Sequence, residues 1–210
     1  MTDPGSPLVL ASNSPRRSAL IKQIGLPFEV VGTTVDEEFH PHESPQDHAV
    51  RLAGEKSEHI SLCRPHQWII GADTIVLAEG KALGKPRDPA DARRMLQIIS
   101  GRQHRVITAF CIRNTSRGIC ASTMVETDVV IKDLSPREIA AYISTGEPMD
   151  KAGAYGAQGI GSFMIREIRG SYTNVVGLPT CELVEELLGL GVIRIDSAAN
   201  SEIILSTPHG

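Results

Sequence analysis

Cysteine is scarce in this 210-residue sequence, and no two cysteines have the C-x-x-C spacing of a redox or zinc motif. The four cysteines are far apart and lie in segments that predict secondary structure, namely Cys63, Cys111, Cys120 and Cys181. This pattern argues against a disulfide framework. It predicts free, buried thiols in a reducing compartment.

An excess of basic residues is also absent. The sequence has 21 Lys and Arg against 25 Asp and Glu, a formal net charge of -4 and a pI near 6.0. Broad binding to nucleic acid or to an anionic membrane surface requires a basic face. We therefore expect neither nucleic acid nor membrane among the partners, although local basic groups can still bind a small anion.

Long hydrophobic runs are missing as well. No stretch approaches the roughly 20 apolar residues of a membrane span, and residues 1–6 have neither a basic region nor a long apolar one, as a secretion signal would. These absences predict a cytoplasmic protein. The length suits one α/β domain or two small lobes that share a cleft.

Among the features that are present, the segment at residues 8–17 organises the rest. Leu8–Ala11 predicts a strand, Ser14 can cap a following helix, and Pro15 suits its first position. Arg16 and Arg17 then occupy a first turn where the helix dipole disfavours cations by about 0.3–1 kcal/mol each. Both can point to water. Two adjacent arginines on a serine-rich turn nevertheless favour an anion ligand, because hydroxyls, free N–H groups and guanidinium forks converge there.

Two charged candidates follow in the next predicted elements. Glu37 lies in an acidic loop, residues 36–38, beyond a predicted strand at 28–31. Such a loop is usually a solvated turn, but one carboxylate beside a phosphate can bind Mg²⁺. Lys56 falls in the apolar stripe of a helix predicted from Pro45 to about Leu62. On sequence alone an ammonium that reaches water is favoured over one that binds phosphate.

Asp73 and Thr74 interrupt the near-continuous apolar run at residues 68–77, which predicts a strand buried on both faces. A buried carboxylate is costly alone, so Asp73 must be neutralised, paired or metal-bound. It could instead accept backbone N–H groups in a structural role. The functional interpretation is favoured because Gly71 and Ala72 leave room for close approach.

Two further segments carry candidates. Lys85 follows a turn at residues 79–80 and is either an ordinary hairpin lysine or, if the hairpin folds back beside Asp73, a ligand of the same anion. Residues 145–159 are glycine-rich with interspersed acid, base, aromatic and amide groups, which favours a ligand-contacting loop. Gln158 in that loop can read a base edge.

The remaining pattern is mainly structural. It predicts helices over 89–99, 136–144 and 179–190, strands over 104–113, 122–131 and 163–168, and a turn over 170–174. The strands at 104–113 and 122–131 and the helix at 136–144 are expected to belong to a second lobe.

Several of these motifs together resemble the Maf family of nucleoside triphosphate pyrophosphatases, in family order from Leu8 to Leu190. The motifs are Leu10-Ala11-Ser12-x-Ser14-Pro15-Arg16-Arg17, Gly71-Ala72-Asp73-Thr74, Lys85-Pro86, Ser100-Gly101-Arg102-x-His104 and Gly146-Glu147-Pro148-x-Asp150-Lys151-Ala152-Gly153-x-Tyr155-Gly156-x-Gln158-Gly159. The resemblance implies a Maf-like, inosine triphosphate pyrophosphatase-like α/β fold: a mixed twisted sheet with flanking helices, in two lobes around a central cleft. The domain would span residues 1–192, with a C-terminal tail over 193–210.

The resemblance also implies an activity, the hydrolysis of dTTP and UTP, with modified pyrimidine nucleotides as further candidates, to the monophosphate and pyrophosphate. Such an enzyme cleans the nucleotide pool, uses a divalent cation, Mg²⁺ or Mn²⁺, and is commonly a homodimer. A non-hydrolysing, nucleotide-sensing regulator of cell division is the alternative, since the same phosphate-binding residues would serve it.

Position by position, the resemblance implies roles for nine residues. The catalytic aspartate matches Asp73, the metal positions match Glu37 and Asp73, the phosphate positions match Ser12, Arg16, Arg17, Lys56 and Lys85, and the base-selecting positions match Arg16, Thr74 and Gln158. Threonine after the aspartate resembles the branch that acts on dTTP and UTP, whereas glutamine there marks a branch that prefers 7-methyl-GTP. Ala157 departs from the family pattern, which has a larger aliphatic residue, and this could loosen the base pocket.

Overall fold

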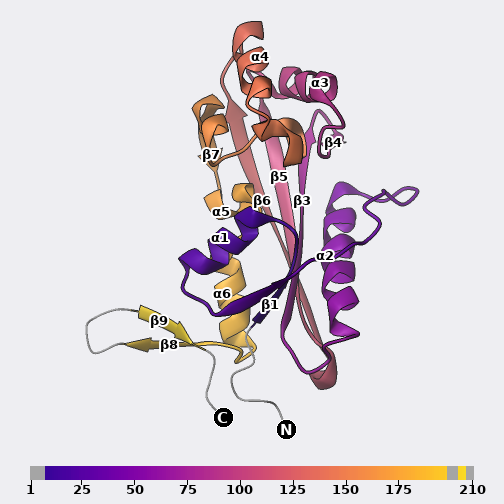
Figure 1. Ribbon diagram of the computed structural model, residues 1–210, viewed down its shortest axis with the longest axis vertical. Coiled ribbons are helices and arrows are strands. Elements are labelled where there is room, and N and C mark those ends of the chain that lie inside the picture. The colour runs from indigo at the N-terminus through magenta and orange to yellow at the C-terminus, as the bar shows by residue number, and fades with distance from the viewer. Residues whose placement is uncertain (1–7, 198–202, 207–210) are drawn as a thin grey trace. The chain divides into compact units, whose positions relative to one another are not determined.

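The computed structural model describes residues 8–197 and 203–206, which contain strands and helices in a mixed α/β arrangement (Figure 1). This confirms the predicted class. Within these residues no helix is long and apolar enough to cross a membrane. The elements are β1 (Leu8–Ala11), α1 (Pro15–Gln23), β2 (Phe28–Val31), α2 (Pro45–Ser61), β3 (Ile69–Ala78), β4 (Lys81–Leu83), α3 (Pro89–Ile99), β5 (Gln103–Asn114), β6 (Ile119–Ile131), α4 (Pro136–Ser144), β7 (Ile165–Arg169), α5 (Tyr172–Val176), α6 (Thr180–Gly189), β8 (Arg194–Ser197) and β9 (Ile203–Ser206), with short 3-10 helices η1 (Thr115–Arg117), η2 (Glu147–Asp150), η3 (Ala152–Ala154) and η4 (Ile160–Met164).

The chain divides into two compact units. Unit 1 takes the residues up to Asp73, Ala109–Met124 and those from Gly177 onward, and unit 2 takes Thr74–Thr108 and Val125–Val176. The main sheet has the strand order β2-β1-β3-β5-β6-β7, with β4 on β3. Its long strands β3, β5 and β6 therefore each contribute residues to both units.

In unit 1, the short strand β1 is the central element. It pairs in parallel with β2 and with β3, so that Leu10 lies opposite both Val30 and Ile70. All four of its residues are buried, as expected of a parallel strand covered on both faces. Helix α2 contacts β1 and buries the apolar stripe that the sequence predicts, including Leu52 and Ile60.

The predicted helix starts are confirmed. Helices α1 to α4 each begin with a capping side chain that accepts a backbone N–H, followed by proline at the first helical position, and the caps are Ser14, Ser44, Asp88 and Ser135. The proline costs nothing there because its missing N–H would have no partner within the helix. At α4, Ser135 and Glu138 form a capping box.

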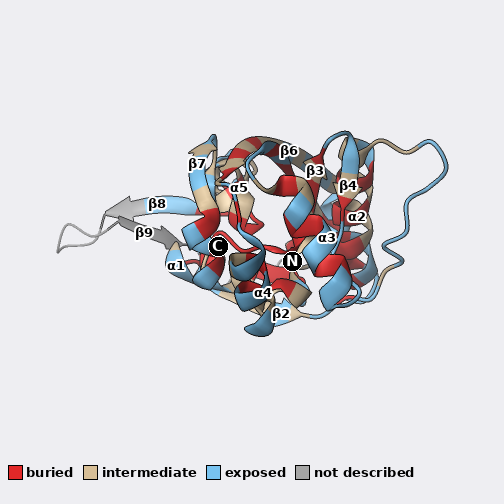
Figure 2. Ribbon diagram, turned by 90° about the horizontal axis from the view of Figure 1, so that it is seen from above, coloured by how far each residue is buried: buried red, intermediate tan, exposed pale blue. Residues whose placement is uncertain are grey.

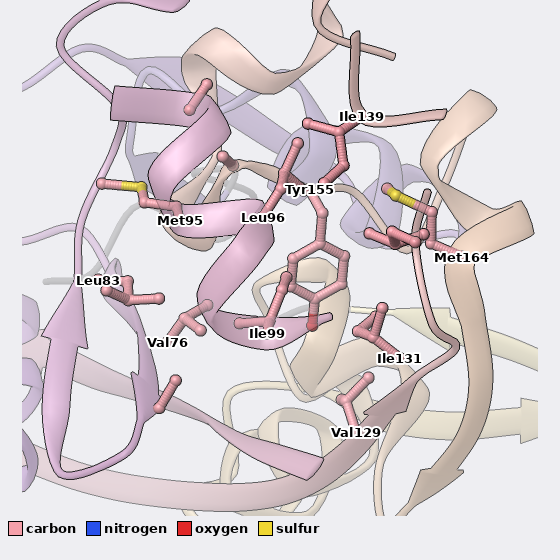
Figure 3. Close-up of a cluster of buried hydrophobic side chains, with 14 of the residues drawn as sticks. Val76, Leu83, Met95, Leu96, Ile99, Val129, Ile131, Ile139, Tyr155 and Met164 are labelled. Atoms are coloured by element: carbon pink, nitrogen blue, oxygen red, sulfur yellow. The ribbon is translucent and has the colours of Figure 1, made fainter. Parts of the chain in front are cut away.

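In unit 2, α3 presents an apolar face to a hydrophobic cluster, while its other face is exposed (Figure 2). Leu96 and Ile99 from this helix pack with Ile131 from β6, and the Tyr155 ring lies among them (Figure 3). Helices α3 and α4 also contact each other. This cluster fixes the segments that carry Lys85 and Gln158.

Three predicted elements differ from the structure. The strand predicted from Phe163 begins only at Ile165, because the Glu147 carboxylate accepts the N–H groups of Ile160 and Gly161 and residues 160–164 form η4 instead. The turn predicted at 170–174 contains the start of helix α5, whose Asn174 is fully buried. The predicted tail from residue 193 onward includes strands β8 and β9, which pair with each other antiparallel. The rest of the predicted tail, residues 198–202 and 207–210, lies outside the described residues.

The prediction of free thiols is confirmed for all four cysteines, but only Cys111 is buried. Cys63, Cys120 and Cys181 are exposed. The sequence spacing also concealed one close pair, since the Sγ atoms of Cys111 and Cys120 lie 3.6 Å apart in unit 1.

Candidate active site

The ammonium group of Lys56 joins two of the predicted site residues in unit 1. Its Nζ lies 2.6 Å from Oε1 of Glu37 and 2.7 Å from Oδ1 of Asp73. The side chains of Lys56 and Asp73 are 9% and 12% exposed, whereas that of Glu37 is 49% exposed. Of the three states expected for a buried Asp73, neutralised, paired or metal-bound, the structure shows the paired one. The favoured interpretation of Lys56, an ammonium in water, is wrong, because the buried carboxylate of Asp73 binds it instead.

A glycine explains how α2 brings Lys56 to Asp73. A Cβ atom on Gly71 would lie 2.2 Å from the carbonyl oxygen of Ala53 and 2.6 Å from the amide nitrogen of Ser57. The backbone of α2 therefore packs directly on β3 at a position where only glycine fits. The space beside Gly71 is thus filled by the backbone of α2, the helix that carries Lys56.

Arg17 is buried and bonded to the backbone. Its Nε donates to the carbonyl of Gly177 at 2.8 Å, and its Nη1 donates to the carbonyl of Ala72 at 2.9 Å and to Oγ of Ser12 at 3.4 Å. Burial lowers the pKa of the Arg17 guanidinium, while the carboxylates of Asp73 and Glu37 raise it. The alternative that both arginines point to water is therefore wrong for Arg17, whereas Arg16 is half-buried.

The start of α1 thus surrounds Ser12 with donors. The Ser12 side chain is buried, and its Oγ also accepts the backbone N–H of Ser14 at 3.1 Å. The structure brings five of the predicted site residues together in unit 1 through these contacts: Ser12, Arg17, Glu37, Lys56 and Asp73. They place two carboxylates and two cations around the end of β1 and the middle of β3.

Thr74, Lys85 and Gln158 belong to unit 2. The hydroxyl of Thr74 lies 3.0 Å from that of Thr108, and Thr108 donates to the carbonyl of Asn174 at 3.0 Å. Lys85 is exposed just beyond β4, and Gln158 is half-buried between η3 and η4.

Part of the glycine-rich segment at residues 145–159 is packed in the protein interior, since residues 153–157 are all buried. Gly153 donates its N–H to the carbonyl of Gly84 at 3.0 Å, which joins this segment to the residue before Lys85. Gly153 has φ of 70°, and a Cβ there would lie 2.9 Å from Val76. The glycine is therefore required for packing within unit 2.

The sequence did not single out a cluster on α2 that contacts the loop of Glu37. Arg51 makes a forked contact with Glu43, and Glu43 also binds the ring of His48. On sequence alone Arg51 pairs with Glu55 at i,i+4, which is typical of an exposed helix face. The contact across eight residues from a loop to a helix has no periodic signal.

Within residues 8–197 and 203–206, no three or more His, Cys, Asp or Glu side chains are grouped as a metal site. Glu37 and Asp73, the predicted metal ligands, share the ammonium of Lys56. Carboxylate oxygens are hard ligands of the kind that Mg²⁺ prefers, and the phosphate oxygens of a nucleotide would add further ligands of the same kind. The donor chemistry therefore fits a divalent cation that binds together with a phosphate.

Comparison with known proteins identifies relatives over most of the chain. The family model for Maf-like proteins matches residues 7–190. A dTTP/UTP pyrophosphatase of Desulfotalea psychrophila is 49% identical over 189 residues, covering 90% of this chain and 97% of that protein. Proteins of the same description from Geotalea uraniireducens and Syntrophus aciditrophicus are 48% identical over 189 residues and 46% identical over 200 residues, and they are covered to 97% and 98%.

A solved structure of the Staphylococcus aureus Ham1 protein aligns over 76% of this chain and 80% of that one, with 15% sequence identity and a TM-score of 0.48. The family match and the three relatives all extend over at least four-fifths of the chain. This chain therefore belongs to the family of Maf-like proteins.

Proposed function

We propose that this protein hydrolyses dTTP and UTP to the monophosphate and pyrophosphate. The observation that carries the proposal is the Lys56 ammonium between Glu37 and Asp73, in a chain whose relatives are described as dTTP/UTP pyrophosphatases. The arrangement supplies a buried carboxylate beside fixed cations, which is what attack on a polyphosphate requires.

In the proposed reaction, water attacks the α-phosphorus and the bond from that phosphorus to the oxygen bridging to the β-phosphorus breaks. Asp73 orients the water and accepts its proton, and pyrophosphate leaves with the electron pair of the broken bond. Lys56 contacts Oδ1 of Asp73, which fixes the orientation of the carboxylate. Ser12, Arg16, Arg17, Lys56 and Lys85 are proposed to bind the phosphates.

We propose Glu37 and Asp73 as the residues that hold Mg²⁺ or Mn²⁺. When bound, the cation would offset charge on the phosphate oxygens. The exposed position of Glu37 suits it to meet a cation that arrives with the nucleotide. Asp73, which is more buried, is suited to hold its place on β3.

The hydroxyl of Thr74 supports the choice of base. Thr108 donates its only hydroxyl proton to the carbonyl of Asn174. In the bond between the two threonines, Thr74 must therefore be the donor and Thr108 the acceptor. The oxygen of Thr74 is then an acceptor toward any further group. Thymine and uracil carry an N–H at ring position 3, whereas cytosine has an acceptor there, so an acceptor favours dTTP and UTP. Arg16 and Gln158 are the other proposed base contacts.

The proposed setting is a cytoplasmic homodimer that cleans the nucleotide pool. Modified pyrimidine triphosphates belong to the same proposed substrate class, because Ala157 leaves more room than a larger aliphatic side chain. Neither expectation changes the chemistry assigned to Asp73.

The test is a panel of triphosphates with Mg²⁺ in ¹⁸O-labelled water. We expect dTTP and UTP to give monophosphate and pyrophosphate, with the label in the monophosphate, because attack is at the α-phosphorus. Label in the pyrophosphate or release of orthophosphate would contradict the mechanism. Tight binding of dTTP with no products would instead favour the nucleotide-sensing regulator.

A further inference from the structure

Glu37 lies in a segment that no secondary structure holds. Residues 32–44 connect β2 to α2 and contain neither helix nor strand. Fixing such a backbone costs about 1–2 kcal/mol of conformational entropy per residue. A carboxylate that must meet a cation at a set place therefore needs contacts that hold this segment.

Arg51 on α2 supplies such contacts. Its Nε donates to Oε1 of Glu43 at 2.6 Å and its Nη2 donates to Oε2 at 2.9 Å, a two-pronged bond that fixes the plane of both groups. The same Nη2 donates to the carbonyl of Glu38 at 2.9 Å. One guanidinium thus binds the segment near its end and also directly beside Glu37.

The acceptor of this fork is itself well held. The Glu43 side chain is 8% exposed, and its Oε2 lies 2.8 Å from Nδ1 of His48 and accepts the N–H of His40 at 3.0 Å. The ring of Phe39 stacks on that of His48 with centroids 3.7 Å apart. The bonds from Arg51 keep the pKa of Glu43 well below its usual range. We call Phe39, Glu43, His48 and Arg51 the Arg51 clasp.

Arg51 and Lys56 belong to the same helix and hold consecutive residues of the segment. Lys56 binds the carboxylate of Glu37, and Arg51 binds the carbonyl of Glu38. Because both side chains extend from one helix, the two contacts together define where the Glu37 carboxylate lies relative to Asp73 on β3.

We propose that Arg51 is a positioning residue that sets the affinity of the Glu37 and Asp73 carboxylates for a divalent cation. The inference rests on the proposed function, since it takes these two carboxylates as the cation ligands. Groups that orient metal ligands without touching the metal typically contribute 10- to 100-fold in metal affinity. The contact of Arg51 with Glu55, an ordinary i,i+4 pair, does not account for the fork to the loop.

The experiment compares the full chain with Arg51→Gln, Arg51→Lys and a control, Arg64→Gln. Arg64 makes a similar forked bond with Glu29, which lies in β2 and outside residues 32–44. Two quantities are measured with a non-hydrolysable analogue of dTTP bound: the dissociation constant of Mn²⁺, from the electron paramagnetic resonance of free Mn²⁺ after correction for Mn²⁺ bound by the analogue alone, and amide hydrogen exchange over residues 33–43.

We expect Arg51→Gln to weaken Mn²⁺ binding by about 10- to 100-fold and to speed exchange over residues 33–43. The Mn²⁺ dissociation constant and the exchange rate of Arg51→Lys should lie between those of the wild type and Arg51→Gln, because lysine keeps the charge but cannot form the two-pronged bond. Arg64→Gln should match the wild type in both measurements. If Arg51→Gln does not fold, Glu43→Gln removes the charged acceptor of the fork and is expected to show the same two effects.

A folded Arg51→Gln variant with the wild-type Mn²⁺ constant would overturn the proposal, even if exchange over residues 33–43 rose, since Arg51 would then hold the loop without placing a ligand. A wild-type chain that binds no Mn²⁺ would overturn it as well. A wild type that binds Mn²⁺ but hydrolyses no nucleotide contradicts the proposed function alone. In that case a weakened constant in Arg51→Gln still supports the positioning role.

Discussion

Lys56 provides one positive charge for two carboxylates, and this determines which substitutions the fold tolerates at these residues. Asp73 is nearly buried, so removing Lys56 would leave its charge without the cation that is hydrogen-bonded to it. Removing the charge of Asp73 instead leaves Lys56 with Glu37. The fold should therefore tolerate a neutral, isosteric residue at position 73 while the chemistry does not.

We predict that Asp73→Asn lowers turnover of dTTP by at least about 10²–10³-fold, because the amide cannot accept the proton of the attacking water. Pyrophosphate release measures the loss. Circular dichroism and the midpoint of urea unfolding show whether the variant is folded, and dTTP binding should persist. Near-normal pyrophosphate release from a folded variant would sink the assignment of Asp73 as the base.

For single residues, the sequence indicated charged candidates for the site but not the partners that these side chains have in the structure. The cost of burying an isolated carboxylate predicted that Asp73 is neutralised, paired or metal-bound, but nothing local identified Lys56 as its partner. The buried contacts of Arg17 with the carbonyls of Ala72 and Gly177 were equally invisible, since the acceptors are far away in the chain. Partners of this kind are set by packing between elements.

Among the elements, those with local causes were predictable. The Ser-Pro and Asp-Pro caps of α1 to α4 lie beside the turns they stabilise, so the sequence gives their helix starts directly. Helices η4 and α5 depend on distant groups instead. The carboxylate of Glu147 holds the start of η4, and Asn174 in α5 donates to the carbonyl of Val106 and to Thr127.

One contact between elements makes the free energy of unfolding depend on pH. His104 near the start of β5 lies 2.7 Å from the hydroxyl of Tyr155, the residue that follows η3. Burial lowers the pKa of His104 to about 4, from a usual value of about 6.5. The unfolded chain therefore binds a proton at this position between about pH 6.5 and pH 4, whereas the folded chain does not.

The free energy of unfolding should accordingly fall as the pH drops through this window, by about 2 kcal/mol at pH 5 from His104 alone. Below pH 4 both states carry the proton and the contribution stops changing. His104→Gln keeps a polar group near Tyr155 but does not titrate. Urea unfolding of both chains at about pH 7 and pH 5 isolates the term, and equal losses in the two chains would contradict the assignment.

For the whole molecule, the division into units runs through the strands. Three of the four boundaries lie between Asp73 and Thr74 in β3, between Thr108 and Ala109 in β5, and between Met124 and Val125 in β6, and the fourth follows α5 at Val176. No linker composition marks the boundaries within strands, because the backbone remains extended across them. The sequence therefore predicted the α/β class but assigned all of the strands at 104–113 and 122–131 to a second lobe, whereas residues 109–124 belong to unit 1.

The segment after α6 bears on where the functional domain ends. Strands β8 and β9 form a two-stranded sheet of their own, and the family match stops at residue 190. Val192 and Ile193, by contrast, are buried. The sequence predicts a tail from residue 193, so a deletion that starts at residue 194 keeps both buried side chains and tests this boundary.

We predict that deletion of residues 194–210 changes kcat/KM for dTTP by less than about twofold and the free energy of unfolding by less than about 0.5 kcal/mol, as is typical of segments outside a core. Deletion from residue 181 onward is the comparison, because it removes the fully buried Leu183 and Leu187 of α6 and should prevent folding. Steady-state kinetics and urea unfolding measure both effects. If the shorter deletion abolished turnover while the chain stayed folded, residues 194–210 would be part of the catalytic unit, and the domain would extend beyond the family match.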